Sequence, residues 1–301
     1  MTDAAKTTPD PPSQASSTWL KVMPGVFVLL WSTGFIGAKY GLPYAGPLTF
    51  LLLRFVAVTS ILTCLAFALQ SKWPTDRKEI GRIALVGILV HGCYLGGVFV
   101  AISLGIPAGV AALLACLQPL LTAALSGWYL GERVRPMQWL GLLIGFLGVA
   151  LVVENKLTLS VNDLYGVAGT AVAVIGITTG TLYQKKHLVH VNLITGSAIQ
   201  FGTVGVIYFF LAAVFETMKV NWTGEFIFAL SWLTVVLSIG AISLFYLMIR
   251  HGAASKVASL FYLVPAITSL FAFGLFGETL GFSAILGMIL ASVGVFLVTK
   301  S

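Results

Sequence analysis

Ten apolar stretches of about 20 residues, separated by short polar breaks, constrain this chain more than any other feature of its sequence. A helix of about 20 residues crosses the roughly 30 Å hydrocarbon core of a bilayer. The stretches are continuously apolar, whereas barrel strands alternate, so they predict an all-α integral membrane protein. Only 9% of the residues are charged, too few to cover a water-soluble globule. The predicted transmembrane helices cover residues 22–41, 47–69, 83–104, 107–130, 136–153, 164–183, 193–215, 226–249, 253–276 and 281–299.

The distribution of positive charge predicts the orientation of these helices. An even number of spans places both ends of the chain on one side, and about thirteen of the 17 lysines and arginines fall on that side. Cytoplasmic loops carry the excess of positive charge, so both termini are predicted to be cytoplasmic. The charges are scattered in ones and twos, which argues against a nucleic-acid partner. The polar N-terminal residues 1–21 predict a disordered cytoplasmic tail.

The second half of the chain resembles the first when the two are aligned with an offset of about 146 residues. Residues 109–152 align without gaps to residues 255–298, with about thirteen identities in 44 positions. Proline, glycine and glutamate coincide, which composition alone explains poorly. The aligned pairs include Pro119 with Pro265, Gly131-Glu132 with Gly277-Glu278, and Arg54 with Gln200.

The alignment predicts two five-helix repeats, over residues 22–153 and 164–299. Because five is an odd number, the second copy would enter the membrane in the opposite direction. Inverted repeats of this kind place a cavity near the middle of the bilayer and allow alternating access from the two sides. The alternative is a duplication that only builds a larger helical bundle.

Several short motifs resemble the EamA-type transporters of the drug/metabolite transporter superfamily. They are Trp31-Ser32-Thr33-Gly34, Leu53-Arg54-Phe55, the proline and Gly-Glu pair of each half, and the segment His91-Gly92-Cys93-Tyr94-Leu95-Gly96-Gly97 with Gln118-Pro119. The resemblance covers nearly the whole chain. It implies a multi-pass protein of the bacterial inner membrane that exports, or facilitates the movement of, amino acids or similar small metabolites.

Arg54 is the one charged residue well inside a predicted span. A charge at that depth is costly unless it faces the bundle interior or a wet cavity. Its guanidinium could hold a substrate carboxylate through two hydrogen bonds, or it could donate to backbone carbonyls and serve packing alone.

His91 and Tyr94 are three residues apart, so an α-helix places them on one face. His91 could bind substrate or carry a proton, or it could be a neutral histidine bonded to a neighbouring helix.

Aromatic side chains could line a mostly apolar pocket, although packing and lipid contact are their commoner roles. The aromatic candidates are Trp31, Phe99, Tyr183, Tyr208, Tyr246, Phe261 and Tyr262. Gln118 stands beside Pro119, and the proline frees a backbone carbonyl in mid-helix. Pro265 repeats this interruption in the second half, and paired interruptions mark transport sites or simple kinks.

Four charged residues at span ends suggest two gates. Lys39 and Glu278 are predicted at the outer ends, and Lys185 and Glu132 at the inner ends. One contact would close each mouth, whereas snorkelling to the interface is the alternative. Small residues in the fifth and tenth spans predict that these helices pack together or form a homodimer. These small residues are Gly141, Gly145, Gly148, Gly287, Ala291 and Gly294.

Two other function classes remain as alternatives, an intramembrane enzyme and a channel. The sequence contains no H-E-x-x-H, G-x-S-x-G or P-loop motif, so neither an enzyme nor an ATP-driven pump is favoured. It also shows no rings of like charge or repeated filter sequences of a channel. We expect no cofactor and no metal site, and the expected partners are a small-molecule substrate and the lipid bilayer.

Overall fold

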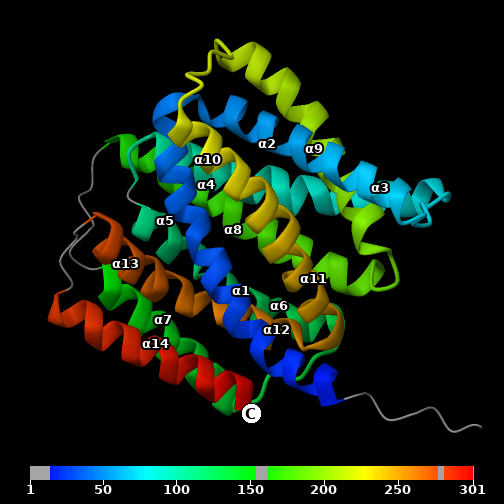
Figure 1. The fold of residues 1–301 in the computed structure, drawn as a ribbon. Coiled ribbons are helices and arrows are strands. Elements are labelled where there is room, and N and C mark those ends of the chain that lie inside the picture. The colour runs from blue at the N-terminus through cyan, green and yellow to red at the C-terminus, as the bar shows by residue number, and fades with distance from the viewer. Residues whose placement is uncertain (1–13, 107, 154–160, 277–280, 301) are drawn as a thin grey trace, which may run out of the picture.

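The computed structural model describes residues 14–106, 108–153, 161–276 and 281–300 as a bundle of helices (Figure 1). The first half contains α1 (Gln14–Gly41), η1 (Leu42–Tyr44), α2 (Pro47–Ala68), α3 (Arg77–Val86), η2 (Gly87–Leu95), α4 (Gly96–Ser103), α5 (Ala108–Ala115), α6 (Gln118–Leu130) and α7 (Pro136–Val153). The second half contains α8 (Val161–His187), α9 (Leu193–Phe215), α10 (Gly224–Trp232), η4 (Leu233–Ala241), α11 (Ile242–His251), α12 (Ala254–Ser259), η5 (Leu260–Tyr262), α13 (Leu263–Phe276) and α14 (Phe282–Lys300).

Seven helical segments in the described residues are long and apolar enough to cross a membrane. They are Val22–Tyr44, Pro47–Ala68, Arg77–Ser103, Leu164–His187, Leu193–Phe215, Gly224–His251 and Ala254–Phe271, and the shorter apolar helices Pro136–Leu151 and Ile285–Lys300 accompany them. Large apolar side chains such as Phe67, Phe210 and Phe296 are exposed on the outside of the bundle, as lipid contact requires. The protein is therefore a multi-pass, all-helical membrane protein.

Helix α1 extends further toward the N-terminus than the sequence predicts. It begins at Gln14, inside the range 1–21 expected to be a disordered tail. Between Gln14 and Lys21 there is no glycine or proline that would stop the helix. Residues 1–13 lie outside the described part of the chain, so the remainder of the tail stays a prediction.

Helix bounds recur in the two halves at the spacing seen in the sequence. α2 begins at Pro47 and α9 at Leu193, which is 146 residues later. The two π-helices show the same relation, because η2 begins at Gly87 and η4 begins 146 residues later at Leu233. A π-helix is a rare local distortion that is frequent at functional sites. Its presence at equivalent positions shows that the halves share local geometry as well as helix order.

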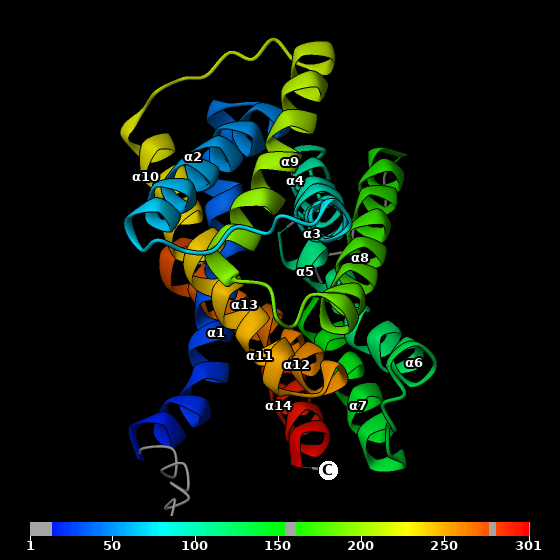
Figure 2. The same cartoon turned by 90° about the vertical axis from the view of Figure 1, so that its right-hand side faces the viewer.

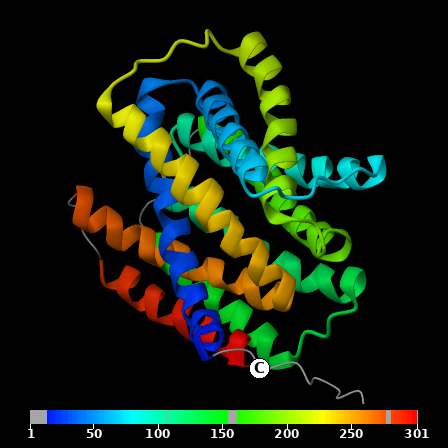
Figure 3. The ribbon, with the colours of Figure 1, turned by 45° about the vertical axis from the view of Figure 1, so that its right-hand side comes forward.

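Helices from the two halves pack against each other in matching pairs. α2 lies against α9, and α7 lies against α14 (Figures 2 and 3). The α7–α14 contact is close because glycines meet there: a Cβ added to Gly148 would lie 2.4 Å from the backbone nitrogen of Ala291. The glycine faces therefore contact each other within one chain, and Gly141, Gly148 and Gly294 are buried. The expected packing of these two helices is therefore present, and the homodimer stays a prediction.

The loops at one end of the bundle are joined across the two halves. Ala45 and Val220 form an antiparallel β-bridge. The carboxylate of Glu216 accepts hydrogen bonds from the backbone nitrogens of Leu48 and Thr49, each 2.8 Å long. It thereby satisfies two N–H groups in the first turn of α2 that have no partner within the helix, and its negative charge lies at the positive end of the helix dipole. α1 begins and α14 ends at the opposite end of the bundle (Figure 1).

Candidate functional site

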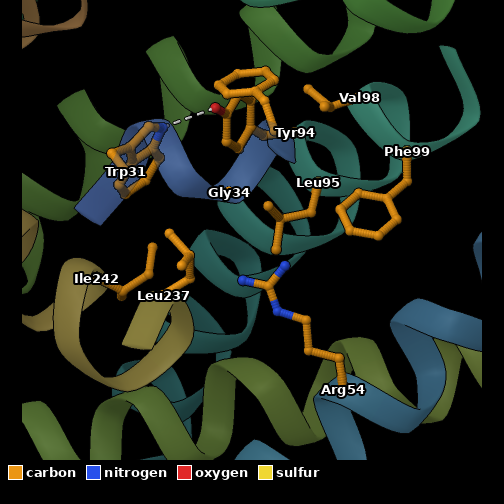
Figure 4. A pocket seen from close by; sticks show the side chains of 10 residues that line it. Trp31, Gly34, Arg54, Tyr94, Leu95, Val98, Phe99, Leu237 and Ile242 are labelled. Carbon is orange, nitrogen blue, oxygen red and sulfur yellow. Dashed lines mark hydrogen bonds between the residues drawn. The ribbon is translucent and has the colours of Figure 1, made fainter. Parts of the chain in front are cut away.

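A small cavity lies in the bundle, where both halves contribute to its wall (Figure 4). Its volume is about 40 Å³, which is room for a few water molecules. The wall is mostly apolar and aromatic and comes from α1, α2, η2, α4, η4 and α11. The lining residues are Trp31, Gly34, Phe35, Arg54, Tyr94, Leu95, Val98, Phe99, Leu237 and Ile242. Four of the residues expected to bind substrate, Trp31, Arg54, Tyr94 and Phe99, are therefore brought together.

Arg54 supplies the charge in this cavity. The residue is buried, with 3% of its surface exposed, and its Nε donates a 2.8 Å hydrogen bond to Oγ of Ser238 in η4. The two terminal nitrogens of the guanidinium point into the cavity between Leu95 and Leu237 (Figure 4). A buried guanidinium is costly unless its donors find acceptors. The bond to Ser238 fixes the plane of the group and leaves its terminal donors directed at the cavity.

Trp31 and Tyr94 form the aromatic side of the cavity. Nε1 of Trp31 donates a 3.2 Å hydrogen bond to the Tyr94 hydroxyl, and the two rings stack with centroids 6.1 Å apart. Phe261 and Phe245 pack against Trp31 at 5.1 and 5.7 Å. Contacts of this kind between aromatic rings stabilise by about 0.5–1.5 kcal/mol beyond area burial. This cluster holds the Trp31 and Tyr94 rings in fixed orientations.

His91 and Tyr246 belong to a second polar cluster, centred on Gln200 of α9. Oε1 of Gln200 accepts from the Tyr246 hydroxyl at 2.8 Å and lies 3.2 Å from Nε2 of His91. Nε2 of Gln200 lies 3.3 Å from Oε1 of Gln184, so the amide oxygen faces His91. An oxygen there requires a proton on Nε2 of His91, which leaves a lone pair on Nδ1. That Nδ1 is buried and has no hydrogen-bond partner among the described residues.

The expectation that His91 and Tyr94 share one helical face is wrong. Both residues lie in η2, which is a π-helix and has wider turns than an α-helix. His91 consequently faces α9, where its ring stacks on Phe201 with centroids 3.9 Å apart. Tyr94 faces α1 and bonds to Trp31. The two side chains serve different clusters.

The remaining candidates lie outside these two clusters. Gln118 is fully buried in α6, and its amide has no hydrogen-bond partner among the described residues. The Tyr262 ring packs on the glycine face of α7, since a Cβ on Gly145 would lie 2.4 Å from it. The Tyr208 hydroxyl donates to the backbone oxygen of Gly92 at 2.8 Å. Tyr183 lies against His187, with ring centroids 4.5 Å apart.

Both proline positions coincide with helix interruptions. α5 ends at Ala115 and α6 begins at Gln118, one residue before Pro119. In the second half, the short 3-10 turn η5 separates α12 from α13, whose third residue is Pro265. The paired breaks expected from the sequence are therefore present.

The structure contains the expected contact between Lys185 and Glu132. Their side chains form an ion pair of 2.7 Å, and both are about one-fifth exposed. The Glu132 carboxylate also accepts from the backbone nitrogen of Ala254 at 3.1 Å, and Lys185 donates to the backbone oxygen of Gly252. These bonds join α6, α8 and α12 at one end of the bundle. Glu278 lies outside the described residues, so its contact with Lys39 stays a prediction.

Two functional partners were not identified as such from the sequence. Ser238 bonds to Arg54, and Gln200 joins His91 to Tyr246. The repeat contained a signal for Gln200, because it aligns with Arg54, but nothing in the sequence distinguishes Ser238 from other helical serines. Among the described residues, no group of three or more His, Cys, Asp and Glu side chains is placed to hold a metal ion.

Comparison with known proteins gives a consistent result. The family model described as "EamA-like transporter family" matches residues 25–154 and, a second time, residues 164–300. A Bacillus subtilis (strain 168) protein named "Uncharacterized transporter YvbV" is 29% identical, with 96% of this chain and 94% of the relative covered. An Escherichia coli (strain K12) "Uncharacterized inner membrane transporter YedA" is 26% identical, with 84% and 81% covered.

A second Escherichia coli (strain K12) protein, named "Probable amino-acid metabolite efflux pump", is 25% identical, with 90% of this chain and 91% of the relative covered. A solved crystal structure with 19% sequence identity superimposes with a TM-score of 0.76 and covers 95% of this chain and 97% of its own. At that identity the likeness concerns the fold alone.

Proposed function

The chain belongs to the EamA-like transporter family, and from this premise we propose that it is a secondary transporter of amino acids or similar small metabolites in the bacterial inner membrane. Its family and its relatives are named transporters, and it is not an enzyme. One observation carries the proposal: a single guanidinium points into an aromatic and apolar cavity whose wall comes from both halves. Substrate would be bound there and released alternately to the two sides.

The architecture that we propose for this mechanism is ten transmembrane helices in two inverted five-helix repeats. The double match of the family and the helix bounds that recur after 146 residues support two copies of one unit. The exchanged contacts support a two-fold relation, because α1 packs on η4 as α8 packs on η2. With five crossings in each copy, the two-fold axis would lie in the membrane plane, as alternating access requires.

Arg54 would recognise the carboxylate of the substrate. A planar guanidinium binds a carboxylate through two parallel hydrogen bonds, and Arg54 keeps both terminal nitrogens on the cavity side. A packing role fits the geometry less well. An arginine that only joined helices would direct its terminal donors at backbone carbonyls, whereas the hydrogen bond of Arg54 to the bundle is made by Nε.

The ion pair between Lys185 and Glu132 would act as the cytoplasmic gate. It joins the two residues at one end of the bundle, and the cavity is far smaller than the roughly 300–1,000 Å³ of a typical ligand site. A cavity of this volume is too small for a substrate, so helices would have to separate before substrate binds. The described acidic residues lie at helix ends and not in the cavity wall, which favours facilitated movement down a gradient over proton coupling.

Transport into proteoliposomes tests this proposal. Vesicles containing the purified protein would be given a mixed pool of labelled amino acids, nucleosides and organic acids. We expect at least one compound to accumulate above protein-free vesicles, and we expect Arg54→Gln to lower that rate at least about tenfold. Arg82→Gln is the matched control, since Arg82 is an exposed arginine of α3. Full transport by Arg54→Gln would contradict the proposed site.

A further inference from the structure

The hydrogen-bonding groups at the cavity are mainly donors, and the two hydroxyl oxygens beside them each already accept one hydrogen bond. The terminal nitrogens of Arg54 donate only. The Tyr94 oxygen already accepts from Trp31, so the Tyr94 hydroxyl has its proton left to give. Ser238 is not among the residues that line the cavity, and its oxygen accepts from Arg54. The indole nitrogen of Trp31 is a donor and is occupied. A ligand that fits these groups must present acceptors.

The charge of the cavity leads to the same conclusion. Arg54 is cationic, and none of the ten residues that line the cavity is acidic. An anion would neutralise the guanidinium, whereas an ammonium group would enter an apolar wall without a partner. In an α-amino acid the ammonium is attached to the carbon next to the carboxylate. A carboxylate bound to Arg54 would therefore hold that ammonium close to the like charge of the guanidinium.

The aromatic rings do not supply an alternative partner for an ammonium. A cation is attracted to the open face of a ring. Trp31 is stacked with Tyr94 and has Phe261 and Phe245 against it, so its faces are largely covered by other rings. Phe99 has Phe50 against it, with centroids 5.4 Å apart. These rings and the aliphatic side chains of the wall favour an apolar substrate body.

We propose, resting on the transport function proposed above, that the cavity selects monocarboxylates with an apolar body whose polar atoms are all acceptors. A 2-oxo acid has this chemistry, because its carbonyl oxygen stands where the amino acid of the same side chain has its ammonium. The site prefers the 2-oxo acid to that amino acid. The two compounds are nearly equal in size, so the widening needed to admit either one does not distinguish them.

Counterflow in proteoliposomes measures this preference without knowledge of the coupling ion or direction. Vesicles loaded with unlabelled compound would be given the same compound labelled outside, using leucine in one arm and the 2-oxo acid of leucine in the other. The carbonyl next to the carboxyl makes the 2-oxo acid more acidic than a simple carboxylic acid, so it stays ionised near neutral pH and passive leakage is small. We expect it to exchange at least about tenfold faster than leucine at equal low concentration.

Variants assign the preference to the cavity. We expect Arg54→Gln to remove the preference and Tyr94→Phe, which loses one donor but keeps the ring, to reduce it about threefold or more. Arg54→Lys keeps the charge and should keep the sign of the preference. Arg82→Gln should match the wild-type protein. The preference of the wild-type protein is measured directly, so a variant that fails to fold does not remove the test.

Two results would overturn the inference. If leucine exchanges as fast as its 2-oxo acid and Arg54→Gln abolishes that exchange, the selectivity is wrong and the transport function stands. If neither compound exchanges, the monocarboxylate class is wrong, and the mixed pool of amino acids, nucleosides and organic acids then decides separately whether the proposed transport holds.

Discussion

Replacing Gly148 by alanine tests whether the contact between α7 and α14 is set by glycine. The added Cβ would lie 2.4 Å from the backbone nitrogen of Ala291 and 2.7 Å from the backbone oxygen of Gly287. Ordinary contact begins at 3.4 Å, so the two helices would have to separate by about 1 Å. Backbone atoms of a helix cannot rotate away as the end of a flexible side chain can.

The size of the effect follows from two opposing terms. Overpacking a close contact costs about 1–3 kcal/mol, and alanine recovers about 0.5–1 kcal/mol of helix propensity relative to glycine. We expect Gly148→Ala to lower the unfolding free energy by about 1–2 kcal/mol, which lowers the unfolding midpoint by roughly 2–4 °C. Thermal unfolding of the purified protein in detergent measures this shift.

Gly81→Ala is the matched control. Gly81 lies in α3, and a Cβ added there meets nothing within 4 Å. Only the propensity term applies, so we expect Gly81→Ala to raise the midpoint by about 1 °C. The two variants therefore shift the midpoint in opposite directions. If Gly148→Ala is as stable as the wild-type protein, the close approach of α7 and α14 does not depend on the missing side chain and the packing argument fails.

Three further predictions concern polar contacts. In a double-mutant cycle of thermal unfolding with Glu132→Gln and Lys185→Gln, we expect a coupling free energy of about 1 kcal/mol between the two side chains, and additive effects would refute the contact. In the same variants, we expect a thiol reagent to label a cysteine placed at that end of the bundle severalfold faster. Glu216→Ala removes the acceptor of the backbone N–H groups of Leu48 and Thr49 and should lower the unfolding free energy by about 1–3 kcal/mol. Glu216→Gln should lower it less because the amide keeps one acceptor oxygen, and thermal unfolding compares the two variants. Gln200→Leu leaves Nε2 of His91 without its acceptor and should lower the unfolding free energy by about 2 kcal/mol or more. Gln200→Glu has nearly the same volume as glutamine and keeps the acceptor, so it separates the loss of the hydrogen bond from a change in volume.

Seven long apolar helices of the described residues were predictable from the sequence because their apolar stretches have the length that a bilayer demands, whereas the stretch 107–130 is divided into α5 and α6. α2 and α9 begin at Pro47 and Leu193, where the apolar runs begin. The π-helices were not predictable. A π-helix and an α-helix can have the same apolar composition, and η2 packs against α8 and α9, which are distant in the sequence. That difference changed the direction of His91 and Tyr94 and so separated two residues that were expected to act together.

Arg54 was predictable as a site residue because an isolated charge within an apolar span needs a polar environment. The partner of Arg54 was not. Ser238 is 184 positions away in the chain, and only the packing of α2 against η4 brings the two together. For the same reason Gln118 and Tyr262 were expected in the cavity but lie beyond it. A residue type indicates which chemistry is available, whereas the tertiary contacts of its helix decide where that chemistry is used.

The two halves have kept the same contact geometry and differ in charge. Arg54 of α2 and Gln200 of α9 are 146 positions apart, and each bonds to a π-helix of the other half, Arg54 to Ser238 and Gln200 to His91. A contact that served packing alone would be satisfied equally well by a neutral amide on both sides, as it is at Gln200. The cation is present on one side only, and it is the side that borders the cavity. Because a buried charge costs more than a neutral group, the cation at Arg54 supports our proposal that the cavity binds an anion.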